Sequence, residues 1–229
     1  LALILAFGLA LPGAMPAVAD PDSGLAGLWH FDDNALDSSG NANHGTVYGG
    51  ATYASGMFDN ALSFDGVDDY VNVPDSPSLD ITGAITVEGW IKLASFSQPA
   101  TVAGKWKDLG ANERGYLLTV ATDGTPRFYI STTGGNYPRA TGSALSLNTW
   151  YHLAGTYDGT NIQLYVDGTP AGTQSQTGAI FSNDEALLIG ANDGYGGSDR
   201  KFTNGLIDEV RIWDEALSAS QLGDVSEPV

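Results

Sequence analysis

Short runs of β-branched and aromatic residues recur along this chain between turn signals, and almost no stretch has the period of a helix. Asp-Gly and Gly-Gly pairs join many of the runs, and such pairs favour tight turns because glycine tolerates a positive φ. Only Ser218 to Leu222 suggests a turn of helix. The pattern therefore predicts an all-β domain of two packed antiparallel sheets over roughly residues 24–223. The expected strands include 27–31, 70–73, 85–93, 115–121, 127–131, 150–157, 162–166, 187–191 and 206–213.

The chain of 229 residues is strongly acidic, with a formal net charge of −18 and only 9 lysines and arginines. That balance argues against nucleic-acid binding, because phosphate contacts need clustered cationic side chains. An acidic surface also attracts cations and repels anionic glycans, so a neutral sugar is the easier partner. The chain has no cysteine, which excludes disulfides, thiol catalysis and thiolate metal sites.

The first 19 residues resemble the end of a secretory signal peptide. Leu1 to Leu11 is an apolar run, and Ala17 to Ala19 has the small-x-small order of a cleavage site. Prolines interrupt the run before it reaches the roughly 20 apolar residues that a spanning helix needs. We expect a secreted or cell-surface protein, with residues 20–26 as a lead segment and no membrane span in the mature chain. A retained anchor is the alternative.

Several segments, in a fixed order, resemble the laminin-G-like branch of the concanavalin A-like lectin/glucanase superfamily. The first is Gly-Leu-Trp-His-Phe-Asp-Asp at 27–33, and the segments at 37–45, 61–71 and 85–92 follow it. The central part is a hairpin at 150–168. The closing part is Asn-Gly-Leu-Ile-Asp-Glu-Val-Arg-Ile-Trp at 204–213, with Ala-Leu-Ser-Ala at 216–219. Together these segments cover most of residues 27–222.

The resemblance implies a jelly-roll β-sandwich of the concanavalin A-like type over residues 27–223, with a short tail at 224–229. It also implies an extracellular module that binds glycans or proteins, often with Ca²⁺. We expect the aromatic residues of these motifs to lie in the core and not to act as platforms for a sugar. They are Trp29, Phe31, Phe64, Trp90, Trp150 and Trp213.

No catalytic pattern is visible in the sequence. The β-glucanases of that superfamily carry Glu-x-Asp-x-Glu on one strand, where alternation places the nucleophile and the acid on the same face. In this chain the only carboxylates two residues apart are Asp20 and Asp22, outside any predicted strand. Nucleophile-elbow and zinc-hydrolase motifs are also missing. We expect no catalysis, with a glycoside hydrolase built from acids on two strands as an alternative.

The loop after the first predicted strand has the chemistry of a calcium site, because it is rich in the oxygen-bearing residues Asp and Asn. The resemblance implies that the first and last strands meet, which would bring an acid of the closing motif to this loop. The predicted ligands are Asp37, Asn41, Asn43 and Asp208. A turn in which Asp37 and Asn41 bond to the backbone is the alternative. A second acidic group consists of Asp65, Asp68 and Asp69.

Two loop regions combine an aromatic ring with polar groups, as sugar sites do. In the first, Trp106 stands among charges in a turn-like context, and in the second, Tyr195 lies in a glycine-rich loop. A third loop around Tyr137 is expected beside them on the rim of the sandwich. For each loop, the alternative is an exposed turn whose ring caps the edge of the core. The candidate ligand-binding residues are Lys105, Trp106, Asp108, Arg114, Tyr137, Asn192, Asp193, Tyr195 and Arg200.

These observations predict a secreted, non-catalytic, lectin-like module that binds a glycan or polysaccharide, with Ca²⁺ as the expected cofactor. A structural or adhesion protein is the first alternative. Its partner would be another protein or another copy of itself, joined through exposed sheet edges. The glycoside hydrolase is the second alternative.

Overall fold

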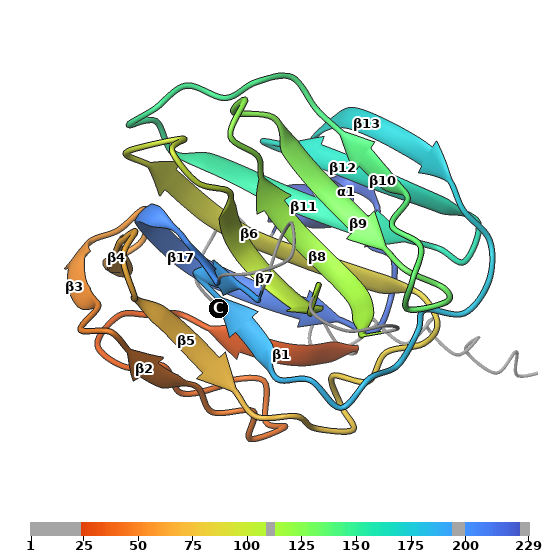
Figure 1. The fold of residues 1–229 in the computed structure, drawn as a ribbon, viewed down its shortest axis with the longest axis horizontal. Helices are drawn as coiled ribbons and strands as arrows, with labels where there is room; N and C mark the ends of the chain where they lie inside the picture. The colour runs from red at the N-terminus through yellow and green to blue at the C-terminus, as the bar shows by residue number, and fades with distance from the viewer. Residues whose placement is uncertain (1–23, 109–112, 194–199, 225–229) are drawn as a thin grey trace, which may run out of the picture.

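The computed structural model describes residues 24–108, 113–193 and 200–224. Two antiparallel sheets pack face to face as a sandwich in this part of the chain (Figure 1). The predicted leader at 1–19 and the end of the predicted tail lie outside the described residues. None of the helices within the described ranges has the length and apolar character needed to cross a membrane.

The larger sheet has eight strands in the order β13-β12-β11-β6-β17-β4-β3, and β1 pairs with β17 beside β4. Its hairpin between β12 and β13 turns at Asp167 and Gly168, whose φ angles of 50° and 69° are those of the predicted Asp-Gly turn. The strands are β1 (Leu25–Trp29), β3 (Thr52–Ser55), β4 (Asn60–Asp65), β6 (Ile85–Leu93), β11 (Tyr151–Tyr157), β12 (Asn161–Val166), β13 (Thr169–Ser175) and β17 (Asn204–Trp213).

The second sheet has seven strands in the order β10-β9-β8-β7-β14-β5-β2. Strands β15 (Ala191–Asn192) and β16 (Lys201–Phe202) form a separate two-stranded sheet. Helix α1 (Ala219–Asp224) confirms the turn of helix predicted near the end of the chain. The seven strands are β2 (Thr46–Tyr48), β5 (Tyr70–Val73), β7 (Ala100–Trp106), β8 (Arg114–Val120), β9 (Pro126–Ile130), β10 (Arg139–Thr141) and β14 (Leu187–Ile189).

The predicted strands are present, and their ends lie within two residues of the predicted ones. The first strand begins at Leu25, inside the predicted lead segment. The strand predicted at 187–191 is divided by Gly190 into β14 and β15, because Gly190 has a φ of 80°. A Cβ at Gly190 would also lie 2.2 Å from the ring of Phe64, so the backbone approaches that ring more closely than any other residue would allow.

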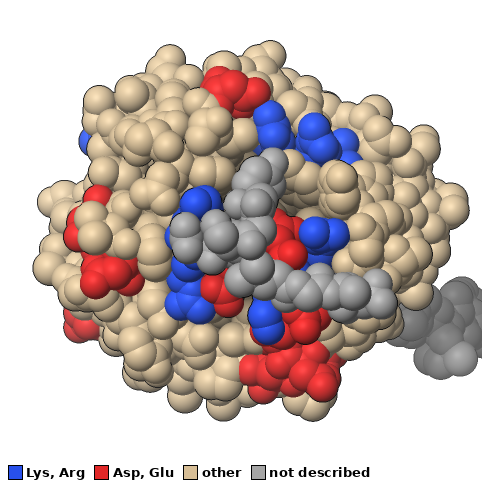
Figure 2. All heavy atoms as spheres, viewed as in Figure 1, with Lys and Arg blue, Asp and Glu red and all other residues tan. Residues whose placement is uncertain are grey.

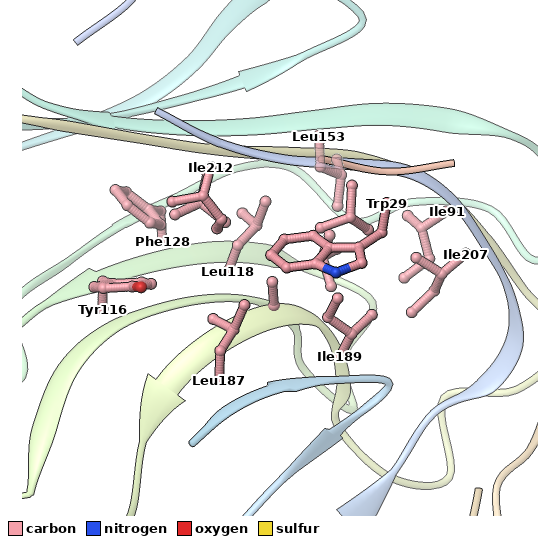
Figure 3. Close-up of a cluster of buried hydrophobic side chains, with 14 of the residues drawn as sticks. Trp29, Ile91, Tyr116, Leu118, Phe128, Leu153, Leu187, Ile189, Ile207 and Ile212 are labelled. Atoms are coloured by element: carbon pink, nitrogen blue, oxygen red, sulfur yellow. The ribbon is translucent and has the colours of Figure 1, made fainter. Parts of the chain in front are cut away.

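The inner faces of the two sheets form one apolar core (Figure 3). Trp29, Phe31 and Phe64 belong to this core, as the sequence predicted. Trp90 and Trp150 are only partly buried, so the prediction was wrong for these two rings. The labelled side chains of Figure 3 come from both sheets and interdigitate between them; they are Trp29, Ile91, Tyr116, Leu118, Phe128, Leu153, Leu187, Ile189, Ile207 and Ile212.

The outer face of the eight-stranded sheet carries a second apolar cluster. Trp213 on this face packs with Tyr165 and with Leu217 and Leu222, which follow the last strand. The amide of Leu217 donates a 2.9 Å hydrogen bond to Oγ1 of Thr86 and so fixes this segment to β6. The C-terminal segment therefore covers part of this sheet.

Replacement of Gly190 by alanine should destabilise the fold by about 3 kcal/mol, since it combines backbone strain at a positive φ with an overlap against Phe64. Gly159→Ala is the matched control, because Gly159 has a φ of 89° but open space around its Cβ position. Chemical denaturation of both variants tests this. Equal losses would contradict the close approach at Gly190.

Candidate functional site

Three loops come together on the outer face of the seven-stranded sheet, the face turned away from the other sheet. The amide of Asp108, after β7, donates a 2.9 Å hydrogen bond to the carbonyl of Asp193, after β15. Nη1 of Arg114 donates to the carbonyl of Gly135, after β9, at 3.0 Å. Figure 2, which looks onto this face, shows acidic and basic side chains gathered around its middle. We call Lys107, Asp108, Arg114, Tyr137 and Asp193 the loop site.

A layered stack lies at the centre of the loop site. The guanidinium carbon of Arg114 lies 5.9 Å from the ring centroid of Trp106 and 5.3 Å from that of Tyr137. Oδ1 of Asp108 accepts hydrogen bonds from Nε1 of Trp106 at 3.0 Å and from Nε of Arg114 at 2.6 Å. Tyr137 is 56% exposed, so it is the ring of this stack that a ligand can reach.

Trp106 and Lys105 differ from their prediction. Trp106 ends strand β7, is 5% exposed and packs against Leu117 and Tyr129, so it supports the stack from below and is no platform for a sugar. Lys105 is 2% exposed, and its Nζ lies 2.5 Å from Asp75 and 2.6 Å from Asp80. Neighbouring strand residues point to opposite faces, which explains why the two side chains separate.

The predicted residues after β15 form a second ionic group. Arg200 binds Asp193 through both Nε and Nη2, and its guanidinium carbon lies 4.3 Å from the ring centroid of Tyr70. The hydrogen bond that Arg200 donates to Asp193 raises the pKa of Arg200, which stays charged. Asn192 is buried, and its Oδ1 has no hydrogen-bond partner among the described residues. Tyr195 lies outside the described residues.

The charges of the loop site are paired with one another. Nζ of Lys107 lies 2.9 Å from Glu185 and 3.5 Å from Glu113, and its hydrogen bond to Glu185 raises the pKa of Lys107. Together with the pairs of Asp108 and Asp193, this leaves a surface with many charged donors and acceptors but little net charge. Charge-assisted hydrogen bonds to hydroxyl groups are the chemistry that such a surface favours.

The predicted calcium loop has the contacts of the backbone-bonded turn. Oδ1 of Asp37 accepts from the amides of Leu28 and Ser39, both at 2.9 Å, and Oδ2 accepts from the amide of Asn43 at 2.8 Å. Nδ2 of Asn41 donates to the carbonyl of Leu25 at 2.9 Å, and Asn43 donates to that of Ala26 at 2.8 Å. The loop thus holds strand β1 in place.

Asp208 does not join that loop. Its Oδ2 accepts from the amides of Met57 and Phe58 at 2.8 and 3.0 Å, and it therefore fixes the turn between β3 and β4. Burial raises the pKa of Asp208 to about 6. The predicted set of four ligands is not assembled in this structure, since its first and last members serve different loops.

The second acidic group is more compact. Carboxylate oxygens of Asp65, Asp68 and Asp69 all lie within 4.8 Å of one another. Asp69 is buried and accepts a 2.9 Å hydrogen bond from the amide of Asp65, and burial raises its pKa. Three carboxylates at this spacing could supply oxygen ligands to a divalent cation.

Residues 65–223, about two thirds of the chain, match the sequence profile of a laminin G-like family described as the concanavalin A-like lectin/glucanases superfamily. The chain belongs to this superfamily. The match confirms the resemblance seen in the sequence motifs, and the two-sheet sandwich agrees with it. No curated protein sequence matches the chain.

Solved structures with the same fold as this concanavalin A-like domain include domain 4 of AbnA, an extracellular GH43 arabinanase from Geobacillus stearothermophilus, in complex with arabinotriose. It superposes with a TM-score of 0.70 at 23% identity, over 90% of this chain and 99% of that one. At this identity the likeness concerns the fold alone.

Two further binding domains also superpose. The binding domain of Paraclostridial Mosquitocidal Protein 1 has a TM-score of 0.72 at 15% identity, over 90% of this chain and 52% of that one. The ligand binding domain of botulinum neurotoxin serotype D, in complex with N-acetylneuraminic acid, has a TM-score of 0.71 at 17% identity, over 90% and 51%. The chain thus spans about half the length of these two domains.

Two residues that shape the outer face of this concanavalin A-like domain were not predicted from the sequence. Glu185 binds Lys107, and Tyr70 lies beneath Arg200. Tyr70 could have been placed on the outer face, because Val71 and Val73 on the same predicted strand are core residues and alternation then turns Tyr70 outward. Glu185 lies 78 residues from Lys107 in the sequence, so their pairing leaves no local pattern.

Two groups on the eight-stranded sheet should make the domain less stable as pH rises. The folded state binds the Asp208 proton more tightly than the unfolded chain does, so the free energy of unfolding should fall by about 2 kcal/mol between about pH 4 and 6. Nδ1 of His30 lies 2.7 Å from Oε1 of Glu209, and this hydrogen bond raises the pKa of His30. Its contribution is present below about pH 6.5 and is lost as pH rises through the raised pKa.

Chemical denaturation across pH measures both contributions. Asp208→Asn keeps an acceptor for the two amides and should flatten only the acidic part of the profile. His30→Gln should flatten only the part above about pH 6.5. A profile that Asp208→Asn leaves unchanged would show that Asp208 is ionised in the folded protein well below pH 6.

Proposed function

We propose that this domain is a non-catalytic carbohydrate-binding module that holds a neutral glycan on the loop site. The observation that carries the proposal is the exposed ring of Tyr137, held on the guanidinium of Arg114, next to paired charges on the same face. An aromatic ring with a few fixed polar groups is the usual composition of a sugar site. The domain of the arabinanase that shares this fold was solved with arabinotriose, which supports the same class of ligand.

The electrostatics of the loop site favour a neutral sugar. Its cations are already bound by Asp108, Glu185 and Asp193, and the whole chain has a formal net charge of −18. A strongly anionic glycan would have to displace these pairs and approach an acidic protein. A neutral glycan can instead bind the free oxygens and N–H groups at the edges of the pairs.

We propose reversible binding without a covalent step. The buried acids of the eight-stranded sheet serve structural partners: Glu88 accepts from Nε1 of Trp213 at 2.9 Å, and Glu209 binds His30 and Arg211. Acids in such roles are poorly placed to attack or protonate a glycosidic bond. The leader-like segment at 1–19 supports secretion as part of the same proposal.

Calcium is part of the proposal as a structural ion. Asp65, Asp68 and Asp69 are the candidates with the better donor spacing, because their carboxylate oxygens already lie within 4.8 Å of one another. This group lies next to β5 of the seven-stranded sheet, so an ion there would stiffen that sheet and would not contact a ligand on Tyr137. Glycan binding measured in Ca²⁺ and again in EDTA distinguishes an ion that only stabilises the sheet from an ion that contacts the ligand.

Affinity electrophoresis of the purified protein in gels with neutral polysaccharides, arabinan among them, tests the function. Wild-type protein should be retarded by at least one of them. Tyr137→Ala should weaken this binding about tenfold, because it removes the accessible ring. Tyr53→Ala is the control, since Tyr53 is an exposed tyrosine of the other sheet.

The outcomes differ clearly. Retardation that depends on Tyr137 and not on Tyr53 supports the proposed site, and retardation unaffected by EDTA leaves calcium with no role beyond stability. Retardation that Tyr137→Ala does not change would move the site elsewhere. No retardation of folded protein in any gel would contradict the function and favour a protein partner or self-assembly.

A further inference from the structure

A second aromatic group lies on the same outer face, beyond the loop site. Tyr48 on β2 and Tyr70 on β5 are cross-strand partners, and their rings stack at 4.9 Å between centroids with 10° between planes. The guanidinium carbon of Arg200 lies 4.3 Å from the Tyr70 centroid, and it must occupy the other side of that ring because Tyr48 fills the first. The ring of Tyr48 thus packs flat against Tyr70, and Tyr48 is 46% exposed.

Two polar side chains lie next to this stack. Thr46 and Asn72 are also cross-strand partners, and they lie two residues along the same two strands from Tyr48 and Tyr70. Alternation puts them on the outer face with the tyrosines, since Val71 and Val73 enter the core and Val47 packs against it. No hydrogen bond joins the side chain of Thr46 or Asn72 to another described residue. We call Thr46, Tyr48, Tyr70 and Asn72 the β2–β5 patch.

The composition of the β2–β5 patch fits a sugar and not an ion. It offers a fixed aromatic pair, one hydroxyl group and one amide, which together can contact an apolar sugar face and bind its hydroxyl groups. Arg200, the cation that lies against the patch, is bound by both carboxylate oxygens of Asp193. The four side chains of the patch are uncharged, and the neighbouring acids Asp68 and Asp69 disfavour an anionic ligand.

The sheet places this patch well apart from the stack of the loop site. Strand β5 and strand β8, which begins at Arg114, are separated by β14 and β7 in the sheet order. At about 4.8 Å per strand, the two groups lie roughly 14 Å apart across the sheet. One sugar ring cannot contact both groups, but a chain that crosses the strands can.

We propose that the β2–β5 patch is a second sugar-binding subsite and that the ligand is a linear, neutral polysaccharide bound along its chain. This inference rests on the proposed function, because it assigns a further part of the same ligand. A module that recognised only the end of a chain would have no use for two separated subsites on one face.

Isothermal titration with linear oligosaccharides, from a disaccharide to a hexasaccharide, tests the inference. The probes are arabino-oligosaccharides, followed by those of any other polysaccharide that retards the protein in the gels. Wild-type affinity should rise with length. Tyr48→Ala should weaken hexasaccharide binding about tenfold and leave disaccharide binding within about twofold, because a short ligand fits the loop site alone.

Asn72→Ala is the second variant, because it removes a polar contact without disturbing the ring stack, and it should also act only on the longer ligands. Tyr53→Ala should act on none. Affinity independent of length, or a hexasaccharide affinity that neither Tyr48→Ala nor Asn72→Ala changes, would overturn the second subsite and leave the loop site intact. Failure of the wild-type protein to bind any neutral polysaccharide would instead contradict the proposed function.

Discussion

Strand β17 is the element on which the eight-stranded sheet depends. It pairs with β6 along one edge and with both β4 and β1 along the other, so three distant parts of the chain meet on it. Strands that lie so far apart in the sequence pair slowly during folding, so we expect this sheet to close late. The register of β17 shifts between Asp208 and Arg211, where Glu209 has a φ of 50°, and this bulge turns the two acids toward Met57 and His30. The segment after β17 then covers part of the outer face of this sheet, whereas Tyr48 and Tyr137 of the other sheet stay exposed.

The charge of the molecule is distributed unevenly. Although the chain has a formal net charge of −18, several of its few cations gather on or around the outer face of the seven-stranded sheet, where acids bind most of them. The resulting pairs are Lys107 with Glu185, Arg114 with Asp108, Arg127 with Asp123 and Arg200 with Asp193. The paired charges and the rings on this face suit hydroxyl groups better than phosphates or sulfates. Net charge alone would have suggested only a uniformly acidic surface.

Local patterns in the sequence were sufficient to predict the fold, because alternation, Asp-Gly turns and ordered motifs each depend on neighbouring residues. They were also sufficient to name the three loops that meet at the loop site. They failed where placement depends on pairing between distant strands. Trp106 was expected at the surface, but its ring packs against Leu117 of β8 and Tyr129 of β9 and is buried there. Tyr48 lies in a strand of three residues, and only its pairing with Tyr70 reveals an aromatic subsite.

The outer face of the seven-stranded sheet is the surface that we propose binds a neutral glycan. Isotopically labelled protein can be titrated with a neutral oligosaccharide while NMR records the chemical-shift change of each backbone amide. Binding on this face should confine the shifts to amides of β2 and β5 and of the loops around Asp108, Tyr137 and Asp193. Shifts centred on β11, β12 or the segment that covers Trp213 would instead place the ligand on the opposite sheet.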